Sequence, residues 1–140
     1  MLLKILFLCT HNSCRSQMAE GWAKKIIGAK AIIYSAGTEP STIDPLAVKV
    51  MKESGIDISG QRSKSISELS NMDFDMVITV CDNAKESCPL WLKTTKKIHK
   101  NFTDPSAISK TLKDENEILN NYRKTRDEIK DFILDISKNL

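Results

Sequence analysis

A cysteine, an arginine and a serine lie close together near the start of the sequence, in the pattern Cys-x5-Arg-Ser formed by Cys9, Arg15 and Ser16. An arginine guanidinium can hold two oxygens of an oxyanion in a fork, and backbone N–H groups of the loop add further donors. The same positive field favours the thiolate form of a cysteine, which is its nucleophilic form. We therefore expect the loop to hold an oxyanion that Cys9 attacks, with the hydroxyl of Ser16 stabilising the thiolate.

The loop is flanked by a predicted strand and a predicted helix. Leu2 to Leu8 form a nearly continuous apolar run, which is typical of a parallel strand covered on both faces. From Gln17 onward, apolar residues recur at helical spacing, so a helix begins where the loop ends. Helix N-termini offer unpaired N–H groups and a positive dipole end, which bind anions. A buried core cysteine before an ordinary loop is the simpler alternative, and these flanking elements argue against it.

Alternating strand and helix patterns continue to the end of the chain. Further strands are predicted at residues 31–34, 74–80 and 97–102, the last from a weaker pattern. Helices are predicted from Pro45, from Ile66 and from about Ser109 to the C-terminus, the last as one helix or two. The alternation predicts an α/β fold in a single domain over residues 1–140. Its four-stranded parallel sheet is expected to be covered by helices on both faces, as a three-layer sandwich.

Polar and sulfur-bearing side chains follow several of these strands, and ligands bind beyond the carboxyl ends of strands in parallel sheets. Cys9, Ser35, Cys81 and Asp104 each lie at such an end. A carboxylic acid at Asp104, with its pKa raised by burial near the anion, would protonate a leaving oxygen. An aspartate before a proline is equally typical of a turn, so both interpretations stay open. His11 lies inside the loop, and we expect its side chain to point to solvent and not to act as a general base.

Cys81 and Cys88 form a second pair of chemical interest. In a continuous helix their Cα atoms would lie roughly 10 Å apart, whereas a disulfide needs about 7 Å or less. A Cys81–Cys88 bond therefore requires the intervening segment to unwind. Residues 83–87 are polar and lack an apolar stripe, so unwinding is expected to cost little. The alternatives are two unrelated cysteines or a zinc site shared with Cys9 and Cys14, whose spacing differs from short zinc motifs.

The composition argues against several functional classes. With 41% hydrophobic and 28% charged residues the chain is ordinary for a globular protein, and a net charge of +3 gives no case for binding nucleic acid. No apolar run approaches the ~18 residues that span a bilayer, and we interpret the N-terminal run as a core strand and not as a signal peptide. We therefore expect a cytoplasmic monomer with no membrane partner. In that reducing compartment the four cysteines are expected to be catalytic or metal-binding and not structural disulfides.

Five motifs together resemble the thioredoxin-coupled arsenate reductases, which share the fold of the low-molecular-weight protein tyrosine phosphatases. The motifs are Cys9–Glu20, Tyr34–Gly37, Val80–Asn83, Cys88-Pro89 and Asp104-Pro105. The resemblance implies that arsenate binds in the loop, where phosphate or sulfate can also lie, and that no cofactor is bound. It implies a substrate-binding set of Thr10, His11, Asn12, Ser13, Cys14, Arg15 and Ser16.

The resemblance also implies a reaction that uses three cysteines. Cys9 attacks arsenic, and Asp104 gives a proton to the leaving oxygen. Cys81 then attacks Cys9, so that arsenite leaves and a Cys9–Cys81 disulfide forms. Cys88 attacks Cys81, and the resulting Cys81–Cys88 disulfide moves outward to be reduced by thioredoxin. Glutaredoxin and mycothiol serve other enzymes of this fold, so the identity of the reductant stays open.

A low-molecular-weight phosphatase acting on phosphotyrosine is the nearest alternative function. The loop and Asp104 would serve both reactions, and a weak phosphatase side activity is expected because phosphate and arsenate have similar shape and charge. The phosphatases typically place aromatic residues after the Asp-Pro pair, where Ser106 and Ala107 stand here. They also lack the pair Cys81 and Cys88. A non-catalytic phosphate- or metal-binding sensor would need neither the acid nor this pair.

Some arsenate reductases bind a potassium ion beside the loop. The ion is held by side chains that match Asn12, Glu20 and Ser35, together with a downstream acidic residue. That last position is Lys64 here, and a lysine ammonium group can take the place of the ion. We therefore predict no bound metal.

Overall fold

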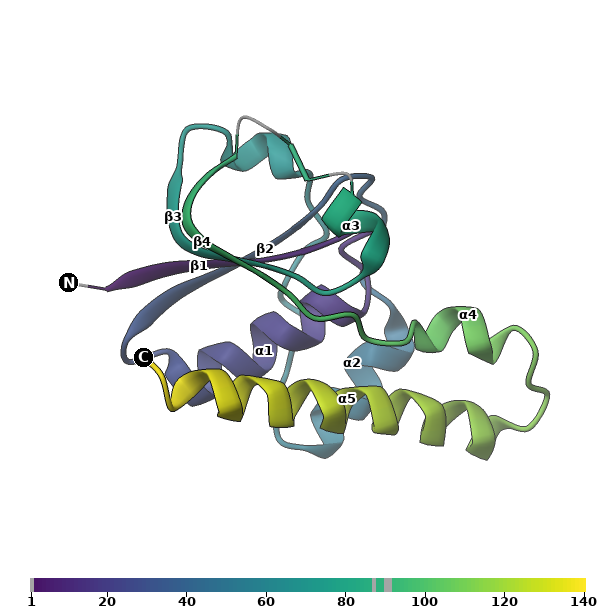
Figure 1. The fold of residues 1–140 in the computed structure, drawn as a ribbon. Helices are drawn as coiled ribbons and strands as arrows, with labels where there is room; N and C mark the ends of the chain where they lie inside the picture. Colours follow the sequence, from purple (N-terminus) through teal and green to yellow (C-terminus); the bar gives the residue numbers. More distant parts are fainter. Residues whose placement is uncertain (1, 87, 90–91) are drawn as a thin grey trace.

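The computed structural model describes residues 2–86, 88–89 and 92–140, and its centre is a parallel sheet of four strands (Figure 1). The strands are β1 (Leu3–Cys9), β2 (Ala31–Gly37), β3 (Asp73–Thr79) and β4 (Lys93–His99), in the order β2-β1-β3-β4. Helices connect the parallel strands, so the predicted α/β fold is confirmed. The carboxyl ends of the four strands share one edge of the sheet, where the candidate site lies.

Helices lie on both sides of the sheet. α1 (Arg15–Ile27), α2 (Pro45–Glu53) and α5 (Glu115–Ser137) lie below it in Figure 1, where α5 packs along α1. The short 3-10 helix η1 (Ile66–Leu69) and α3 (Asp82–Glu86) lie above it. Within the described ranges, no helix is both long enough and apolar enough to cross a membrane.

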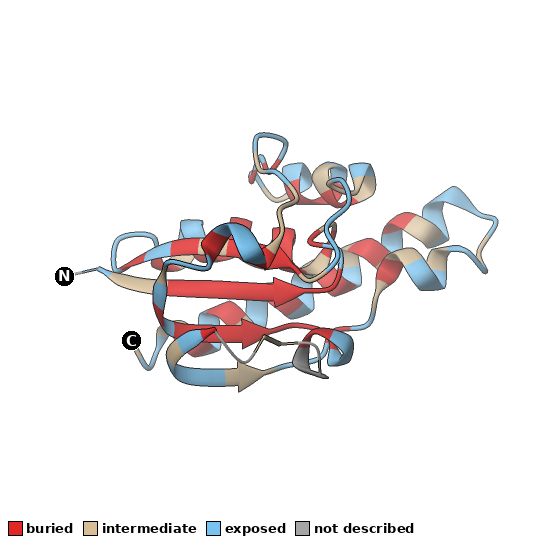
Figure 2. Cartoon of the chain, turned by 90° about the horizontal axis from the view of Figure 1, so that it is seen from above, coloured by how far each residue is buried: buried red, intermediate tan, exposed pale blue. Residues whose placement is uncertain are grey.

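Burial explains which strands the sequence marks clearly. Residues Ile5 to Cys9 of β1 are all buried, because β1 lies between β2 and β3 (Figure 2). β4 is an edge strand with exposed Lys93, Lys96 and Lys97, and lysines on an edge discourage pairing with another chain. The predicted bounds 97–102 of this strand are wrong, because the strand begins at Lys93 and ends at His99. Its polar, half-exposed pattern carries no apolar run that would mark these bounds.

The C-terminal helical pattern predicted from about Ser109 forms one helix, α5, which begins only at Glu115, and the short helix α4 (Pro105–Ser109) precedes it. The buried residues of α5 are Leu119, Tyr122, Thr125, Ile129, Ile133 and Ile136. Arg126 interrupts this stripe. Its guanidinium donates to the Val50 carbonyl at 2.9 Å and to Glu53 at 3.0 Å, so it ties α5 to the end of α2.

Candidate active site

Residues 10–14 form the loop between β1 and α1, and Asn12 is its structural centre. Asn12 has a φ of 50°, in the left-handed region that asparagine tolerates better than most residues. Its buried amide donates to Ser16 Oγ at 2.8 Å and to Ser35 Oγ at 3.0 Å. Its Oδ1 accepts from the Lys64 N–H at 3.0 Å. The side chain of Asn12 therefore fixes the loop to α1, to β2 and to the segment before η1.

The backbone carbonyls of residues 9–14 all accept hydrogen bonds from donors outside this segment. The pairs are Thr38 N–H to Cys9, Glu39 N–H to Thr10, Ser41 N–H to His11, Gln17 Nε2 to Asn12, Asp44 N–H to Ser13 and Met18 N–H to Cys14. A trans peptide places each following N–H opposite to its carbonyl. The N–H groups of the loop are therefore turned inward, where they can serve as donors to an oxyanion.

The cavity inside the loop has a volume of about 90 Å³, roughly the share of three water molecules in the liquid. Its lining residues are Cys9, His11, Ser13, Cys14, Arg15, Ser41, Asp104 and Ser106. These include two thiols, one guanidinium, one imidazole and one carboxylate, but no Phe, Tyr or Trp side chain. The size and the donors fit a small tetrahedral oxyanion.

Arg15 and Asp104 lie next to each other in the lining of this cavity. One guanidinium nitrogen of Arg15 donates to the Phe102 carbonyl at 3.0 Å, and another lies 3.7 Å from Asp104 Oδ2. Asp104 Oδ1 accepts from the N–H and the hydroxyl of Ser106, at 3.0 and 2.8 Å, at the start of α4. Asp104 is thus a capping residue, as the turn interpretation expects, and it also lines the anion cavity. Its role as proton donor stays a prediction.

Cys9 and Cys81 meet at the floor of the site. Their Sγ atoms lie 3.5 Å apart, with Cys9 donating, and both side chains are buried. Thr10 Oγ1 lies 3.4 Å from Cys81 Sγ and accepts from Asn83 Nδ2 at 2.9 Å. Because β1 and β3 are adjacent, their carboxyl ends bring together two thiols that lie 72 residues apart in the chain.

The hydrogen bond between the two thiols shifts their pKa values in opposite directions. Hydrogen bonds from Cys9, Thr10 and the Ala84 N–H outweigh burial and lower the pKa of Cys81 to about 5. The hydrogen bond to Cys81, together with burial, raises the pKa of Cys9, although Arg15 opposes this. The contact with Cys81 thus opposes the expected thiolate at Cys9, and that thiolate stays a prediction. That expectation rested on the loop and on Arg15, and it did not include a second thiol at contact distance.

One thiolate per molecule is therefore expected at neutral pH. Since the pKa of Cys81 is about 5, the ultraviolet absorbance of thiolate should appear as the pH rises through that value and should vanish below it. Replacing both Cys9 and Cys81 by serine should remove the step. Cys14→Ser should keep it, because burial holds the pKa of the Cys14 thiol well above its ordinary value. A titration with no step in the acidic range would contradict this assignment.

The other residues of the predicted site lie as follows. The hydroxyl of Ser16 accepts from Asn12 and is buried, so its proposed contact with a Cys9 thiolate stays a prediction. His11 is exposed as expected, and its Nδ1 bonds the Glu39 carbonyl at 2.9 Å. Cys88 is half-buried, and its side chain forms no disulfide.

Polar residues beside the loop are paired with one another. Ser35 donates to one oxygen of Glu20, and Lys24 lies 2.5 Å from the other. The ammonium group paired with Glu20 is thus that of Lys24, whereas Lys64 Nζ donates to the Arg62 carbonyl at 3.1 Å. These donors already satisfy the oxygens that a cation would need. Across residues 2–86, 88–89 and 92–140, no three His, Cys, Asp or Glu side chains gather as a metal site.

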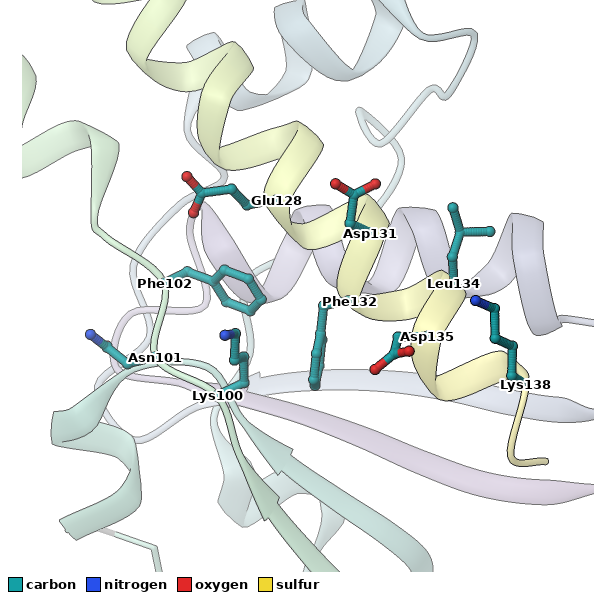
Figure 3. Close-up of a pocket in the computed structure, with 9 residues that line it drawn as sticks. All are labelled: Lys100, Asn101, Phe102, Glu128, Asp131, Phe132, Leu134, Asp135 and Lys138. Atoms are coloured by element: carbon teal, nitrogen blue, oxygen red, sulfur yellow. The ribbon is translucent and has the colours of Figure 1, made fainter.

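A larger hollow of about 690 Å³ lies between the segment after β4 and α5 (Figure 3). Its lining residues are Lys100, Asn101, Phe102, Glu128, Asp131, Phe132, Leu134, Asp135 and Lys138. It holds no thiol and no loop donor, so the chemistry belongs to the smaller cavity. Phe102 connects the two spaces, because its ring packs edge-on against Phe132 in the larger hollow and its carbonyl accepts from Arg15, which lines the smaller cavity. No local pattern in the sequence singles out Phe102 for this role.

Residues 4–140 match the family described as low molecular weight phosphotyrosine protein phosphatase. The chain belongs to this family, and its resemblance to the arsenate reductases of the same fold is confirmed. It is 46% identical to the arsenate reductase of Bacillus subtilis (strain 168), over 89% of this chain and 88% of that protein.

Solved structures of both kinds resemble this chain. A structure described as an arsenate reductase in the phosphate binding state is 34% identical, with a TM-score of 0.76 over 99% of this chain and 98% of that one. A low molecular weight protein tyrosine phosphatase from T. tengcongensis is 29% identical, with a TM-score of 0.75 over 99% of each chain. The fold therefore serves both kinds of protein, and the side chains of the site must distinguish the reactions.

Proposed function

We propose that this protein reduces arsenate to arsenite in the cytoplasm, and that reduced thioredoxin supplies the electrons. The observation that carries the proposal is the 3.5 Å separation of Cys9 Sγ and Cys81 Sγ beneath an oxyanion cavity. Hydrolysis of a phosphate ester needs one nucleophile, whereas reduction by two electrons needs a second thiol that can close a disulfide. The names of the curated relatives, which are arsenate reductases, support the same choice.

In the first step arsenate lies among the inward N–H groups and the Arg15 guanidinium. The sulfur of Cys9 bonds to arsenic, and one arsenate oxygen leaves as water after receiving the proton of the Cys9 thiol. Asp104 lines the same cavity, 3.7 Å from Arg15, and we expect it to pass on that proton. The backbone N–H groups of the loop already point at the anion, so they need no rearrangement during the reaction.

In the second step the Cys81 thiolate attacks the sulfur of Cys9. The sulfur–arsenic bond breaks, its electron pair stays on arsenic, and arsenite leaves while the Cys9–Cys81 disulfide forms. Cys88 then attacks Cys81, which releases Cys9 and forms the Cys81–Cys88 disulfide. A dithiol reductant then reduces the Cys81–Cys88 disulfide and is itself oxidised to a disulfide, which restores the three thiols. The low pKa of Cys81 suits it to the second step, since only the thiolate attacks.

A phosphatase acting on phosphotyrosine is the second candidate. The cavity of about 90 Å³ is lined by no Phe, Tyr or Trp side chain, and Ser106 lines it together with Asp104. Such a site offers little apolar surface to an aryl group, so we expect slow hydrolysis of aryl phosphates as a side activity. Inorganic phosphate and sulfate are expected to bind in place of arsenate.

The test compares the two reactions in one preparation. With thioredoxin, thioredoxin reductase and NADPH, arsenate should cause NADPH oxidation, with one arsenite formed for each NADPH consumed. Hydrolysis of para-nitrophenyl phosphate by the same protein should be slow. Rapid hydrolysis without arsenate-dependent oxidation would assign the protein to the phosphatases. If glutaredoxin or mycothiol supports turnover and thioredoxin does not, the oxyanion chemistry stands and the reductant changes.

A further inference from the structure

A chain of three side chains joins the sheet to α3 outside the site described above. His99, at the end of β4, lies with Nδ1 2.7 Å from Thr79 Oγ1 and Nε2 2.8 Å from Asp82 Oδ1. An ionised carboxylate only accepts, so Nε2 must carry a proton, and the other ring nitrogen of a neutral His99 accepts from the Thr79 hydroxyl. The imidazole is 22% exposed and Thr79 is buried, so the ring is held from the sheet side.

Asp82 is the first residue of α3 and directly follows Cys81. α3 spans only five residues, and a helix of that length does not hold itself together in water. Its described contacts are few: His99 to Asp82, Asn83 to Thr10, and the buried side chain of Ala84. Figure 1 shows α3 at the carboxyl end of the sheet, where these contacts fix it. The stability of α3 therefore depends on contacts with its neighbours.

In the relay proposed above, we expect formation of the Cys81–Cys88 disulfide to require unwinding of α3. A helical path would hold the Cα atoms of Cys81 and Cys88 roughly 10 Å apart, beyond the ~7 Å of a disulfide. A contact made only by the helical form lowers the fraction of unwound molecules. His99 contacts α3 at Asp82, the residue next to Cys81.

We propose that His99 is a positioning residue that holds α3 in its helical form through Asp82, and thereby sets how readily Cys81 pairs with Cys88. This inference rests on the proposed relay. Loss of the contact should favour the unwound form and hence the disulfide. Asp82 is largely exposed, so the effect should be that of one hydrogen bond to a partly solvated charge, about three- to tenfold in the equilibrium.

Two substitutions separate the two bonds of the imidazole. In His99→Asn the amide group lies near the position of Nδ1, so its oxygen can accept from the Thr79 hydroxyl while the bond to Asp82 is lost. In His99→Gln the amide nitrogen takes the place of Nε2, and the bond to Asp82 can persist. Both are made in a Cys9→Ser background, where Cys81 can pair with Cys88 but not with Cys9. The equilibrium constant for that disulfide is measured by mass spectrometry in glutathione buffers of defined redox poise.

His99→Asn is expected to raise this constant about three- to tenfold, and His99→Gln to leave it within about twofold. In an Asp82→Ala background, His99→Asn should have no further effect, as a double-mutant cycle through one contact requires. Hydrogen exchange of the α3 amides should quicken in His99→Asn while exchange in β1 stays unchanged. If His99→Asn has the same effect with and without Asp82, or no effect, the inference is overturned.

The measurement uses no arsenate, so it separates the two proposals. A failed arsenate assay beside the expected shift in the disulfide equilibrium would remove the proposed reaction and leave the role of His99 standing. Should Cys81 and Cys88 form no disulfide in any variant, the role of His99 falls together with the relay. Because Asp82 lies at the surface, Asp82→Ala supplies a folded variant even if substitution of His99 disturbs the sheet.

Discussion

Replacing Cys81 with serine is expected to abolish arsenate reduction while phosphate still binds in the loop. A serine cannot close a disulfide with Cys9, so the sulfur–arsenic bond has no thiol to break it. The donors to the oxyanion come from the loop and Arg15, and the substitution leaves them in place. Arsenite formed per molecule is measured after mixing with excess arsenate and reductant, and phosphate affinity is measured by calorimetry.

Cys88→Ser provides the matched comparison. Without Cys88 the first two steps can still run once, so about one arsenite per molecule should form before the protein stops as a Cys9–Cys81 disulfide. Peptide mapping should find that disulfide in Cys88→Ser and none in Cys81→Ser. Repeated turnover in either variant would show that the relay is not the route of the electrons.

Gly37→Ala is expected to damage both the stability and the oxyanion site. A Cβ at this position would lie 2.6 Å from the Thr10 carbonyl oxygen and 3.0 Å from the Asn12 nitrogen. Both are backbone atoms of the loop, so the loop must shift and cannot simply rotate a side chain away. Overpacking of this kind costs about 1–3 kcal/mol in the free energy of unfolding. A displacement of about 1 Å at the donors should lower kcat/KM for arsenate about 100-fold.

Gly60→Ala is the control for Gly37→Ala, because a Cβ there meets no atom within 4 Å. Its free energy of unfolding should stay within about 0.5 kcal/mol of the unsubstituted protein, and its activity should be unchanged. Urea unfolding and the arsenate assay measure the two effects in each variant. Full activity in a stable Gly37→Ala protein would mean that the loop tolerates displacement.

The parts of the fold that the sequence predicts well are those with dense local patterns. The apolar run of β1, the loop from Cys9 and the helix after it follow directly from residue types, and Arg15 is found in that loop. β4 was misplaced because an edge strand of lysine and threonine has little apolar content. Strand order also escapes a local pattern, although it decides which strand ends become neighbours.

The parts of the site that escape the sequence depend on contacts between distant segments. Thr10 and Asn83 lie 73 residues apart, and Arg15 and Phe102 lie 87 apart, so neither pair leaves a spacing to detect. The strand predicted at residues 31–34 extends to Gly37 in the structure, where Gly37 packs against the loop. The opposite pKa shifts of the Cys9 and Cys81 thiols likewise follow only from their contact.

The outward carbonyls of the loop have a consequence for how substrates are told apart. Because the inward donors are backbone groups, arsenate and phosphate meet the same number of them in the same arrangement, and affinity alone separates the two anions poorly. Phosphate is expected to act as a reversible competitive inhibitor that binds and dissociates unchanged, since a thiol does not reduce phosphorus. We therefore expect discrimination to be kinetic, since of the two bound anions only arsenate has a central atom that thiols can reduce by two electrons.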